Sequence, residues 1–255
     1  MNHTPHTPLR TVATVAIVGR GRLGRAIARA LEAAGLRVFG PLGRGEVVPL
    51  ADIVLLCVPD AEIAGAAAAL ADRADHPGLV GHVSGATPIT GVDFGLHPLQ
   101  TFTGDEGPEA FHGIGCAIAG RTPEALDVAA HLAELLGTRP FPLADEDRAS
   151  YHAAASVASN FVVTLLAAAE QLAATAGLTG ADARALLAPL VRTTVENWAA
   201  RGAGSALTGP VARGDVQTVG RQRDAVTTNA PDLLPLFDEL VTSTRALSEK
   251  GRTAA

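Results

Sequence analysis

Three glycines near the N-terminus have the spacing that lets a backbone cradle a phosphate group. The stretch VAIVGRGRLGRAIA places Gly19, Gly21 and Gly24 in a G-x-G-x-x-G pattern, after an apolar run and before a helical pattern. The first glycine permits a tight turn, the second lets the backbone approach a pyrophosphate, and the third lets the helix pack on the strand. The helix start offers unpaired N–H groups and a positive dipole end. We predict a dinucleotide site here that includes Arg22 and Leu23; a plain strand-to-helix turn is the alternative.

The residues after the second predicted strand favour NADP over NAD. An NAD site normally has an acidic residue about 20 residues after the first glycine, which binds the ribose 2′-hydroxyl. That position falls near Phe39 and Gly40, and neither is acidic. Arg44 follows closely, and Arg20 and Arg22 lie in the glycine turn, so a 2′-phosphate would find cationic partners. We expect NADP, with Arg44 as its first ligand, and NAD as the less favoured alternative.

A second group of candidate residues follows the later strands. Ligands of an open parallel sheet bind beyond the carboxyl ends of its strands. There we expect small and hydrogen-bonding residues, some of them against the cofactor: Val58, Pro59, Ser84, Gly85, His97 and Gln100. His97 has the chemistry of a general acid or base, or it could orient a substrate carbonyl. A strand-end histidine bonded to backbone is the open alternative.

The stretch YHAAASVASNF carries polar side chains on an otherwise apolar helix. At about 100° per residue, His152, Ser156 and Asn160 fall within one stripe roughly 80° wide. A helix this apolar should be buried nearly all round, so the stripe must face a cleft or polar partners. We favour a cleft; the alternative is that small Ser and Ala groups merely allow close helix packing.

These residues need elements that hold them, and the first half of the chain predicts a parallel sheet with crossover helices. The expected strands cover 11–19, 36–40, 52–59, 78–84, 94–99 and 113–120, and the expected helices cover 24–35, 60–74 and 121–137. The link from Phe39 to Asp52 is too short for a complete crossover helix with its loops.

The second half of the chain shows only helical patterns, expected at 145–176, 181–201, from 215 and within 231–250. The fold class is therefore α/β: a Rossmann-type parallel sheet domain followed by an all-α C-terminal domain. We divide the chain into a disordered tail at 1–10, a dinucleotide-binding domain at 11–142 and a helical substrate and dimerisation domain at 143–255. A homodimer through these helices is expected, because their apolar faces exceed what a small domain can cover.

Composition excludes several other classes of function. The net charge of −6 argues against nucleic acid as the main partner. No stretch reads as a membrane span, and the first ten residues lack the apolar core of a signal peptide, so we expect a cytoplasmic protein without membrane contact. Cys57 and Cys116 lack the spacing of a metal or redox pair, and we expect reduced thiols and no metal site.

Six motifs in order, GRGRLG, CVPD, HVSGA, HPLQTF, YHAAASVASNF and LTGPVARGD, resemble a bacterial family. Its members pair a Rossmann-like NAD(P)-binding domain with a helical C-terminal domain of unknown function, and they are grouped with the 6-phosphogluconate dehydrogenase and β-hydroxyacid dehydrogenase superfamily. The resemblance spans about residues 12 to 230. It implies an NAD(P)-dependent oxidoreductase with a cleft between two domains, and a C-terminal domain like that of 6-phosphogluconate dehydrogenase. It implies no substrate.

Relatives in that superfamily, such as ketopantoate reductase and 3-hydroxyisobutyrate dehydrogenase, carry a catalytic lysine about one turn before an asparagine. Asn160 matches the asparagine, but Ser156 stands where the lysine would be, and the one lysine of the chain is Lys250. A proton would then have to come from His97, His152, Tyr151 or water.

Two functions stay open at this point. One is a reductase or dehydrogenase that acts on a small 2-oxo or hydroxy acid, with a ketopantoate-like substrate conceivable by analogy. The roles expected there fall to these residues: His97 or His152 for the proton, Ser84 and Asn160 for the carbonyl, Ser156 and Gln100 for substrate contact, and Arg213 of LTGPVARGD for the acid group. The other is a sensor or interaction protein that binds a dinucleotide without chemistry, as the missing lysine suggests.

Overall fold

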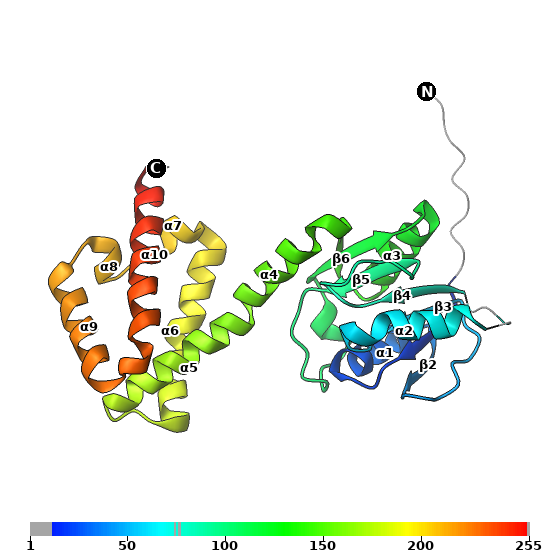
Figure 1. The fold of residues 1–255 in the computed structure, drawn as a ribbon, viewed down its shortest axis with the longest axis horizontal. Coiled ribbons are helices and arrows are strands. Elements are labelled where there is room, and N and C mark those ends of the chain that lie inside the picture. The colour runs from blue at the N-terminus through cyan, green and yellow to red at the C-terminus, as the bar shows by residue number, and fades with distance from the viewer. Residues whose placement is uncertain (1–11, 74, 76–77, 254–255) are drawn as a thin grey trace. The chain divides into compact units, whose positions relative to one another are not determined.

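The structure is a computed structural model that describes residues 12–73, 75 and 78–253, with the side chains of 252 and 253 left out (Figure 1). The chain forms two compact units, one ending at Ser159 and the other beginning at Asn160. The disordered tail predicted at 1–10 lies outside the described residues.

The first unit is built on a seven-stranded, mostly parallel sheet. Its strands are β1 (Thr14–Val18), β2 (Arg37–Leu42), β3 (Ile53–Leu56), β4 (Leu79–His82), β5 (Phe94–Pro98), β6 (Gly115–Gly120) and β7 (Arg139–Pro142). They lie in the order β2-β1-β3-β4-β5-β6-β7, and only the β5–β6 pair is antiparallel. The chain direction across the sheet reverses at β1, which pairs with both β2 and β3, so the glycine turn after β1 lies at the switch point where such sheets bind ligands.

The sequence predicted six of these strands, and β7 was missed. Its residues include Pro140 and Pro142, which have no N–H to donate to a sheet. Proline is tolerated in an edge strand, and β7 lies at the edge of the sheet beyond β6.

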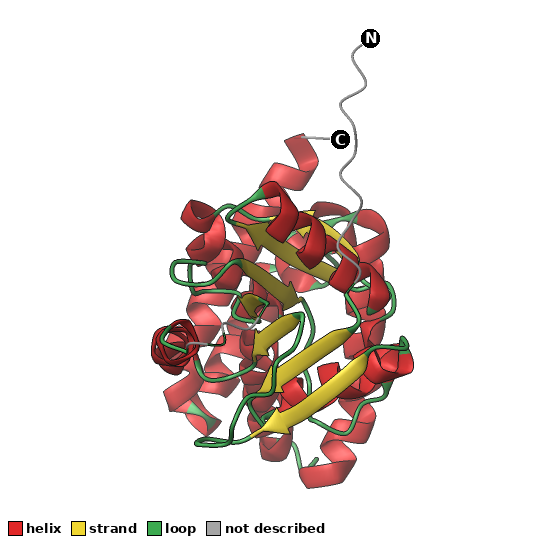
Figure 2. Ribbon diagram, turned by 90° about the vertical axis from the view of Figure 1, so that its right-hand side faces the viewer, coloured by secondary structure: helices red, strands yellow, loops and turns green. Residues whose placement is uncertain are grey.

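Helices cover both faces of the sheet (Figure 2). They are α1 (Arg22–Ala33), α2 (Asp60–Ala71) and α3 (Pro123–Leu135), with a short 3₁₀ turn, η1 (Pro108–Phe111), beside α1. Successive strand residues point to opposite faces, and β1 shows this clearly: Val15 and Ile17 pack in the core with α1 and α3, whereas Ala16 packs in the core with α2. Segment 43–52 between β2 and β3 contains no helix, in agreement with the short link in the sequence.

The predicted helix 145–176 is two helices. After η2 (Asp145–Asp147) the chain forms α4 (Arg148–Ala158) and α5 (Asn160–Thr175), and Ser159 between them leaves helical geometry, with φ −124° and ψ −80°. Serine is a weak helix former because its hydroxyl competes for backbone hydrogen bonds. The single stripe predicted from His152 to Asn160 assumed an unbroken helix and is therefore wrong beyond Ser159.

The predicted domain boundary at Pro142 coincides with the end of β7, but the compact unit continues through α4 to Ser159. Arg148, the first residue of α4, explains the difference. Its guanidinium bonds Asp145 and the carbonyl oxygen of Ser84, so the start of α4 is fixed to the loop that follows β4.

The second unit is helical. It contains α5, α6 (Gly180–Arg201), α7 (Ala203–Ala206), α8 (Pro210–Arg213), α9 (Val216–Asn229), η3 (Pro231–Leu233) and α10 (Leu234–Thr253). By length and composition alone, the run Asp145–Thr175 could cross a membrane, with a mean hydropathy of 1.5 over its most apolar window. One such run is weak support for a membrane span, and the absence of membrane contact stays a prediction.

Two glycines give a matched test of the packing. A Cβ on Gly81 in β4 would lie 2.4 Å from the ring of the buried Phe94, whereas a Cβ on Gly65 in α2 would meet nothing within 4 Å. We expect Gly81→Ala to lower the free energy of unfolding by about 1–3 kcal/mol through overpacking. Gly65→Ala should raise it by about 0.5–1 kcal/mol, because alanine is the better helix former. Urea unfolding of both variants tests this, and a Gly81→Ala protein as stable as the wild type would contradict the packing.

Candidate functional site

The glycine turn after β1 has the shape that a dinucleotide phosphate needs. Gly19 has φ +123°, and a Cβ there would lie 2.2 Å from the carbonyl oxygen of Cys57. A Cβ on Gly24 would lie 2.2 Å from the carbonyl oxygen of Gly19. Gly21, which precedes α1, has its nearest such neighbour at 4.0 Å. Glycines 19 and 24 therefore close the turn against β3 and α1, while the space over Gly21 stays open for a ligand at the N-terminus of α1.

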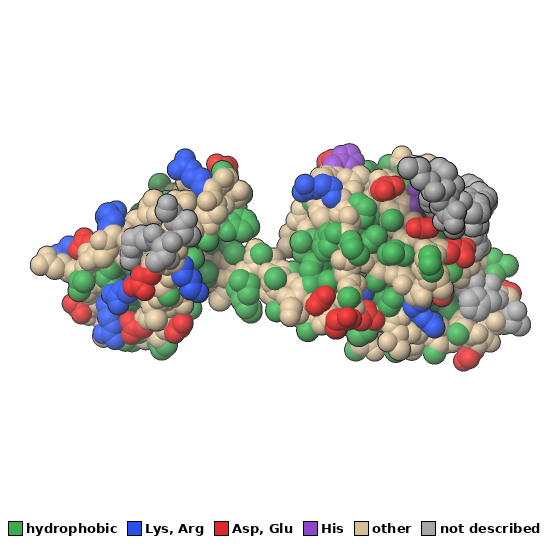
Figure 3. All heavy atoms as spheres, turned by 90° about the horizontal axis from the view of Figure 1, so that it is seen from above, with side chains coloured by type: hydrophobic (Ala, Val, Ile, Leu, Met, Phe, Trp, Pro, Cys, Tyr) green, Lys and Arg blue, Asp and Glu red, His purple; other side chains and the backbone are tan. Residues whose placement is uncertain are grey.

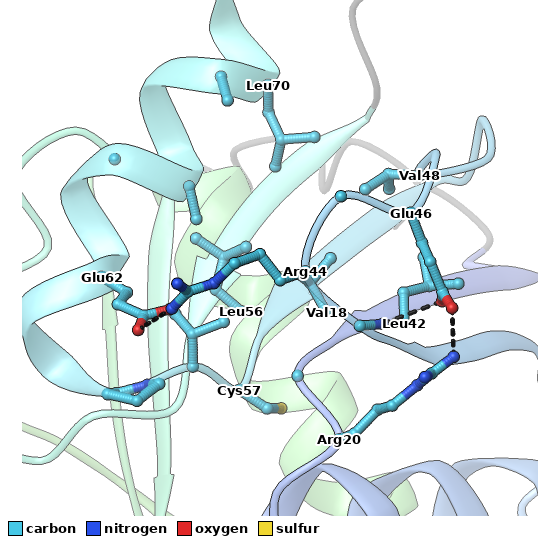
Figure 4. A pocket seen from close by; sticks show the side chains of 18 of the residues that line it. Val18, Arg20, Leu42, Arg44, Glu46, Val48, Leu56, Cys57, Glu62 and Leu70 are labelled. Carbon is cyan, nitrogen blue, oxygen red and sulfur yellow. Dashed lines mark hydrogen bonds and ion pairs between the residues drawn. The ribbon is translucent and has the colours of Figure 1, made fainter.

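A cavity of about 1250 Å³ lies on one side of this turn (Figure 4). Its wall is formed by the glycine turn, the segment from Leu42 to Val48, the end of β3 and one side of α2. Arg20 pairs with Glu46 and Arg44 pairs with Glu62, as the dashed lines in Figure 4 show. Glu46 also accepts a hydrogen bond of 2.9 Å from the backbone of Gly43. The predicted phosphate ligand Arg44 thus lies in the cavity, with its side chain 85 % exposed and a carboxylate as partner.

A second cavity of about 360 Å³ adjoins the first, and the two share Gly21, Cys57, Val58 and Pro59. It brings together ten of the residues predicted from sequence: Gly21, Arg22, Leu23, Val58, Pro59, Ser84, Gly85, His97, Gln100 and His152. Asp60 at the start of α2 lines it as well. Polar groups from three strand ends and from α4 therefore face one small space beside the glycine turn.

His97 is the histidine of the smaller cavity whose pKa is strongly shifted. It lies at the carboxyl end of β5, and its Nδ1 is 2.7 Å from the hydroxyl of Tyr151, whose ring stands edge-on to it at 5.5 Å. Burial, with the nearby His152 and Arg148, lowers the pKa of His97 to about 4, against a smaller opposing effect of Asp60. The imidazole is therefore neutral at pH 7.

Tyr151 lies behind His97 and does not line the cavity. Its ring also contacts Phe141 of β7 at 6.0 Å between centroids. Burial raises the pKa of Tyr151 to about 12, so the phenol keeps its proton at neutral pH. The sequence suggested Tyr151 only as one of several proton sources, because nothing in it indicated that α4 would turn this side chain toward β5.

Two further groups of this region were not predicted from sequence. Arg148 is 2 % exposed; its Nε donates to Asp145 Oδ1 over 2.6 Å and its Nη1 donates to the carbonyl oxygen of Ser84 over 3.3 Å. His82 is fully buried, and burial lowers its pKa. Opposite charges three residues apart usually form a solvated surface pair, and a lone histidine in a strand is usually a core residue. The sequence therefore offered no signal that Arg148 or His82 lies beside the site.

Ser84 has its hydroxyl engaged in a turn. Its Oγ accepts hydrogen bonds from the backbone of Ala86 over 3.2 Å and Thr87 over 2.9 Å, and it bonds the hydroxyl of Thr87 over 3.0 Å. This turn shapes one wall of the smaller cavity. The role predicted for Ser84 toward a substrate carbonyl stays a prediction.

Three predicted site residues do not line either cavity. Ser156 lies in α4, whereas Asn160 and Arg213 belong to the second unit, at the start of α5 and the end of α8. Their roles stay predictions. In the same loop Asp215 caps α9 by accepting the N–H of Thr218 over 3.0 Å.

Within the described residues, no group of three or more His, Cys, Asp or Glu is placed to hold a metal ion. Burial raises the pKa of Cys57 and of Cys116 to about 12 each, so both are neutral thiols.

The sheet order and the glycine turn at its switch point define the class: a Rossmann-like NAD(P)-binding fold followed by a helical region, similar to NAD(P)-dependent oxidoreductases. The chain belongs to the family defined by the domain of unknown function DUF2520, whose model matches residues 114–244. This confirms the resemblance that the sequence motifs indicated. A comparison with curated proteins found no match.

Solved structures support the class along nearly the whole chain. A protein of Bacteroides fragilis assigned as an NADP oxidoreductase is 22 % identical with a TM-score of 0.76, covering 92 % of this chain and 98 % of its own. A protein of Thermotoga maritima is 25 % identical with a TM-score of 0.75, covering 94 % and 100 %. Pyrroline carboxylate reductase of Plasmodium falciparum, with NADP bound, is 12 % identical with a TM-score of 0.55, covering 93 % and 98 %. The first and third likenesses show the fold alone.

The lowered pKa of His97 predicts a pH-dependent stability. Between pH 6.5 and about 4 the unfolded chain binds a proton at His97 that the folded chain does not, so the free energy of unfolding falls as the pH falls through this window. Its share at pH 4.5 should be roughly 2 kcal/mol. Urea unfolding of the wild type and of His97→Gln at pH 7.5 and 4.5 measures it, and Gln should remove that share while leaving the share of His82. An equal loss in both proteins would contradict the assignment.

Proposed function

We propose that the protein is an oxidoreductase that transfers hydride between a nicotinamide dinucleotide and a small 2-oxo or hydroxy acid. One observation carries the proposal: a glycine turn fit for phosphates separates two adjoining cavities, and the smaller one holds a neutral histidine. The larger cavity suits the adenosine half, and the smaller suits the nicotinamide with the substrate. When bound, the nicotinamide supplies or accepts the hydride.

The side chains of the smaller cavity suit an acidic substrate with a polar reacting group. Arg22 brings a permanent positive charge to its rim, where the pyrophosphate or a substrate carboxylate would be stabilised. His97 and Gln100 offer hydrogen bonds to a carbonyl or hydroxyl oxygen. The turn held by Ser84 and the small Gly85 form the part of the wall beside His97.

We propose NADP as the cofactor, with Arg44 and Arg20 as ligands of the 2′-phosphate. Both guanidinium groups lie in the larger cavity, on the side of β2 where the adenosine ribose of a Rossmann-like site belongs. Each one is paired with a carboxylate, Glu62 or Glu46, which a phosphate would have to displace. The same carboxylates supply a specific argument for NAD, because Glu46 could instead accept a hydrogen bond from an unphosphorylated ribose.

Variants of these ion pairs separate the two cofactors. We expect Arg44→Ala to weaken NADPH binding about tenfold, because a charge-assisted hydrogen bond is lost, and to leave NADH binding unchanged. Glu62→Gln, the matched control, should free Arg44 and strengthen NADPH binding. Fluorescence titration with both coenzymes measures the dissociation constants. Weaker NADH binding in Glu46→Gln, with no effect of Arg44→Ala on NADPH, would overturn the choice of NADP.

Coenzyme binding without turnover would favour the second candidate function, a sensor or interaction protein that binds a dinucleotide without chemistry. Ser156 at the position of the superfamily lysine is the observation that keeps this second function open. Hydride transfer to a panel of 2-oxo acids, ketopantoate among them, decides between the two. Loss of turnover with intact NADPH binding in His97→Gln supports the enzyme; absence of any NADPH binding in the wild type overturns the proposal.

We also propose that the helical unit forms a homodimer with a second copy of the chain. Among its described side chains only Ala183, Val219, Val226 and Ala230 are buried, and none is larger than valine. Large apolar side chains are visible in green on its surface in Figure 3. Leu186 and Leu190, one turn apart on α6, are 60 % and 65 % exposed. A standard interface buries ~800 Å² on each partner, and apolar side chains such as these form its centre.

A charge on this apolar face should break the dimer. We expect the wild type to be dimeric in light scattering at micromolar concentration, and Leu190→Glu to shift it toward monomer because a buried charge is costly. Ala199→Glu is the matched control. Ala199 is also exposed on α6, but its spacing of nine residues from Leu190 places it on the opposite face of the helix. A monomeric wild type, or a wild type that binds lipid vesicles through this unit, would contradict the proposal.

A further inference from the structure

We propose that Tyr151 fixes His97 in the tautomer that carries its hydrogen on Nε2, so that the smaller cavity meets a neutral hydrogen-bond donor and not a base. Tyr151 is thus a positioning residue, since it acts through His97 and does not line the cavity. The consequence for the substrate rests on the proposed function; the tautomer itself does not.

Only one direction of the hydrogen bond between Tyr151 and His97 gives the phenol hydrogen an acceptor. Nδ1 of His97 and the hydroxyl of Tyr151 are 2.7 Å apart, so one of the two must donate. Among the hydrogen bonds of the described residues, the hydroxyl takes part in this one alone. If Nδ1 donated, the phenol hydrogen would be left without an acceptor in a half-buried place. If the phenol donates, Nδ1 is the acceptor, and the imidazole hydrogen must sit on Nε2.

Gly85 packs against the His97 ring at the edge that carries both nitrogens. A Cβ on Gly85 would lie 2.9 Å from Cε1 and Nε2 and 3.0 Å from Nδ1 of His97, so only glycine leaves room for the ring. Gly85 and His97 both line the smaller cavity, and because Nδ1 bonds Tyr151, Nε2 is the nitrogen that remains for a ligand. Gly85 was predicted from sequence as a cofactor contact, and its packing against His97 is a second reason for glycine at this position.

The surrounding charges keep His97 neutral, as a defined tautomer requires. His152 and Arg148 face it from α4, His82 faces it from β4, and Asp60 faces it from α2. Burial and the three basic groups lower the pKa of His97, and Asp60 raises it by less. The phenol also stays protonated, because burial raises the pKa of Tyr151. The two neutral side chains are therefore joined by a hydrogen bond in which one hydrogen lies between the phenol oxygen and Nδ1.

His82 supplies an internal reference for the tautomer. The backbone N–H of Ser84 lies 3.2 Å from Nδ1 of His82 and can only donate, so Nδ1 must accept. Nε2 of His82, 3.2 Å from the carbonyl oxygen of Pro88, then carries the hydrogen. His82 and His97 should share one tautomer for independent reasons.

An Nε2–H donor suits a substrate whose oxygen accepts a hydrogen bond. The carbonyl of a 2-oxo acid is such a group, and its oxygen gains negative charge during reduction, which the donor stabilises. When the proton passes from Nε2 to that oxygen, the N–H bond breaks and the O–H bond of the product forms. As that bond breaks, Nδ1 takes the phenol proton, so His97 stays neutral and Tyr151 becomes a phenolate. Nδ1 then returns this proton to Tyr151 as Nε2 takes one from water, so one solvent proton is consumed for each hydride and the resting tautomer is restored. The resting site can therefore donate a hydrogen bond to a carbonyl substrate, whereas it has no acceptor nitrogen for the hydroxyl proton of an alcohol.

Nitrogen NMR of the coenzyme-free full chain with ¹⁵N-labelled histidine tests the tautomer directly. His97→Gln assigns the His97 signals by their loss, and His82 provides the reference pattern. We expect His97 of the wild type to match His82 at pH 7. In Tyr151→Phe, which keeps the ring against Phe141 but removes the hydroxyl, the ratio of Nε2–H to Nδ1–H should fall by about two- to tenfold. His152→Gln, the matched control, should leave the ratio unchanged.

Two results would overturn the inference: an Nδ1–H pattern for His97 in the wild type, or a ratio of Nε2–H to Nδ1–H that is unchanged in Tyr151→Phe. If Tyr151→Phe does not fold, fluorinated tyrosine replaces it. Tyr151 is the only tyrosine in the chain, so one site is labelled. A more acidic phenol should shift the Nδ1 signal of His97, and an unmoved signal overturns the inference. None of these measurements uses coenzyme, so a failure to bind NADPH would remove the proposed function and leave the tautomer result standing.

Discussion

The ion pair between the buried Arg148 and the partly exposed Asp145 is the interaction on which the arrangement of the site depends. Arg148 is 2 % exposed, and it also bonds the carbonyl oxygen of Ser84, while Asp145 accepts the N–H of Ile89 over 3.2 Å. Removing Asp145 would leave the buried Arg148 without its carboxylate partner, which is destabilising. β5 makes room for it, because a Cβ on Gly95 would lie 3.0 Å from Arg148 Nη2. Because this pair joins the start of α4 to the loop after β4, the next turn of α4 can reach only the end of β5.

Ligands along this edge of the sheet are therefore selected in two ways, by the backbone at the glycine turn and by side chains in the smaller cavity. At the glycine turn the selection is steric and made by backbone: Gly19 and Gly24 touch carbonyl oxygens so closely that any side chain would break the turn. In the adjoining smaller cavity the selection is made by side chains whose orientations are set from behind. His97 is held by Tyr151, and the turn at Ser84 is held by its own hydroxyl and by Arg148. A rigid backbone cradle suits a constant phosphate group, whereas side-chain positions can differ between substrates without a change of fold.

Local patterns in the sequence predicted the elements, and long-range contacts decided the rest. Glycine spacing and apolar runs placed the turn and six strands, because both signals are local. β7 was missed, because Pro140 and Pro142 oppose a strand unless it lies at an edge, and no local signal shows where an edge is. The break at Ser159 and the burial of Arg148 were missed for a related reason: apolar periodicity continues through the break, and an arginine three residues after an aspartate reads as an exposed pair. That the strand-end residues of the smaller cavity lie together followed from the sequence, because carboxyl ends of parallel strands share one edge; the roles of these residues stay predictions. Tyr151 comes from a helix whose direction no pattern specifies.

If His97 supplies the proton, as proposed, the site does not require the lysine that relatives in the superfamily carry at the position of Ser156. A lysine beside this cavity would add a fixed charge next to groups that already lower the pKa of His97, Arg148 and His152 among them. Under the proposed function, another cation would compete with His97 for the same substrate oxygen. A neutral imidazole backed by a phenol supplies a hydrogen-bond donor without that charge, and the permanent positive charge is left to Arg22 at the rim, where an acid group would be bound. Under the proposed function, Ser156 is consistent with a site whose hydrogen-bond donor comes from β5.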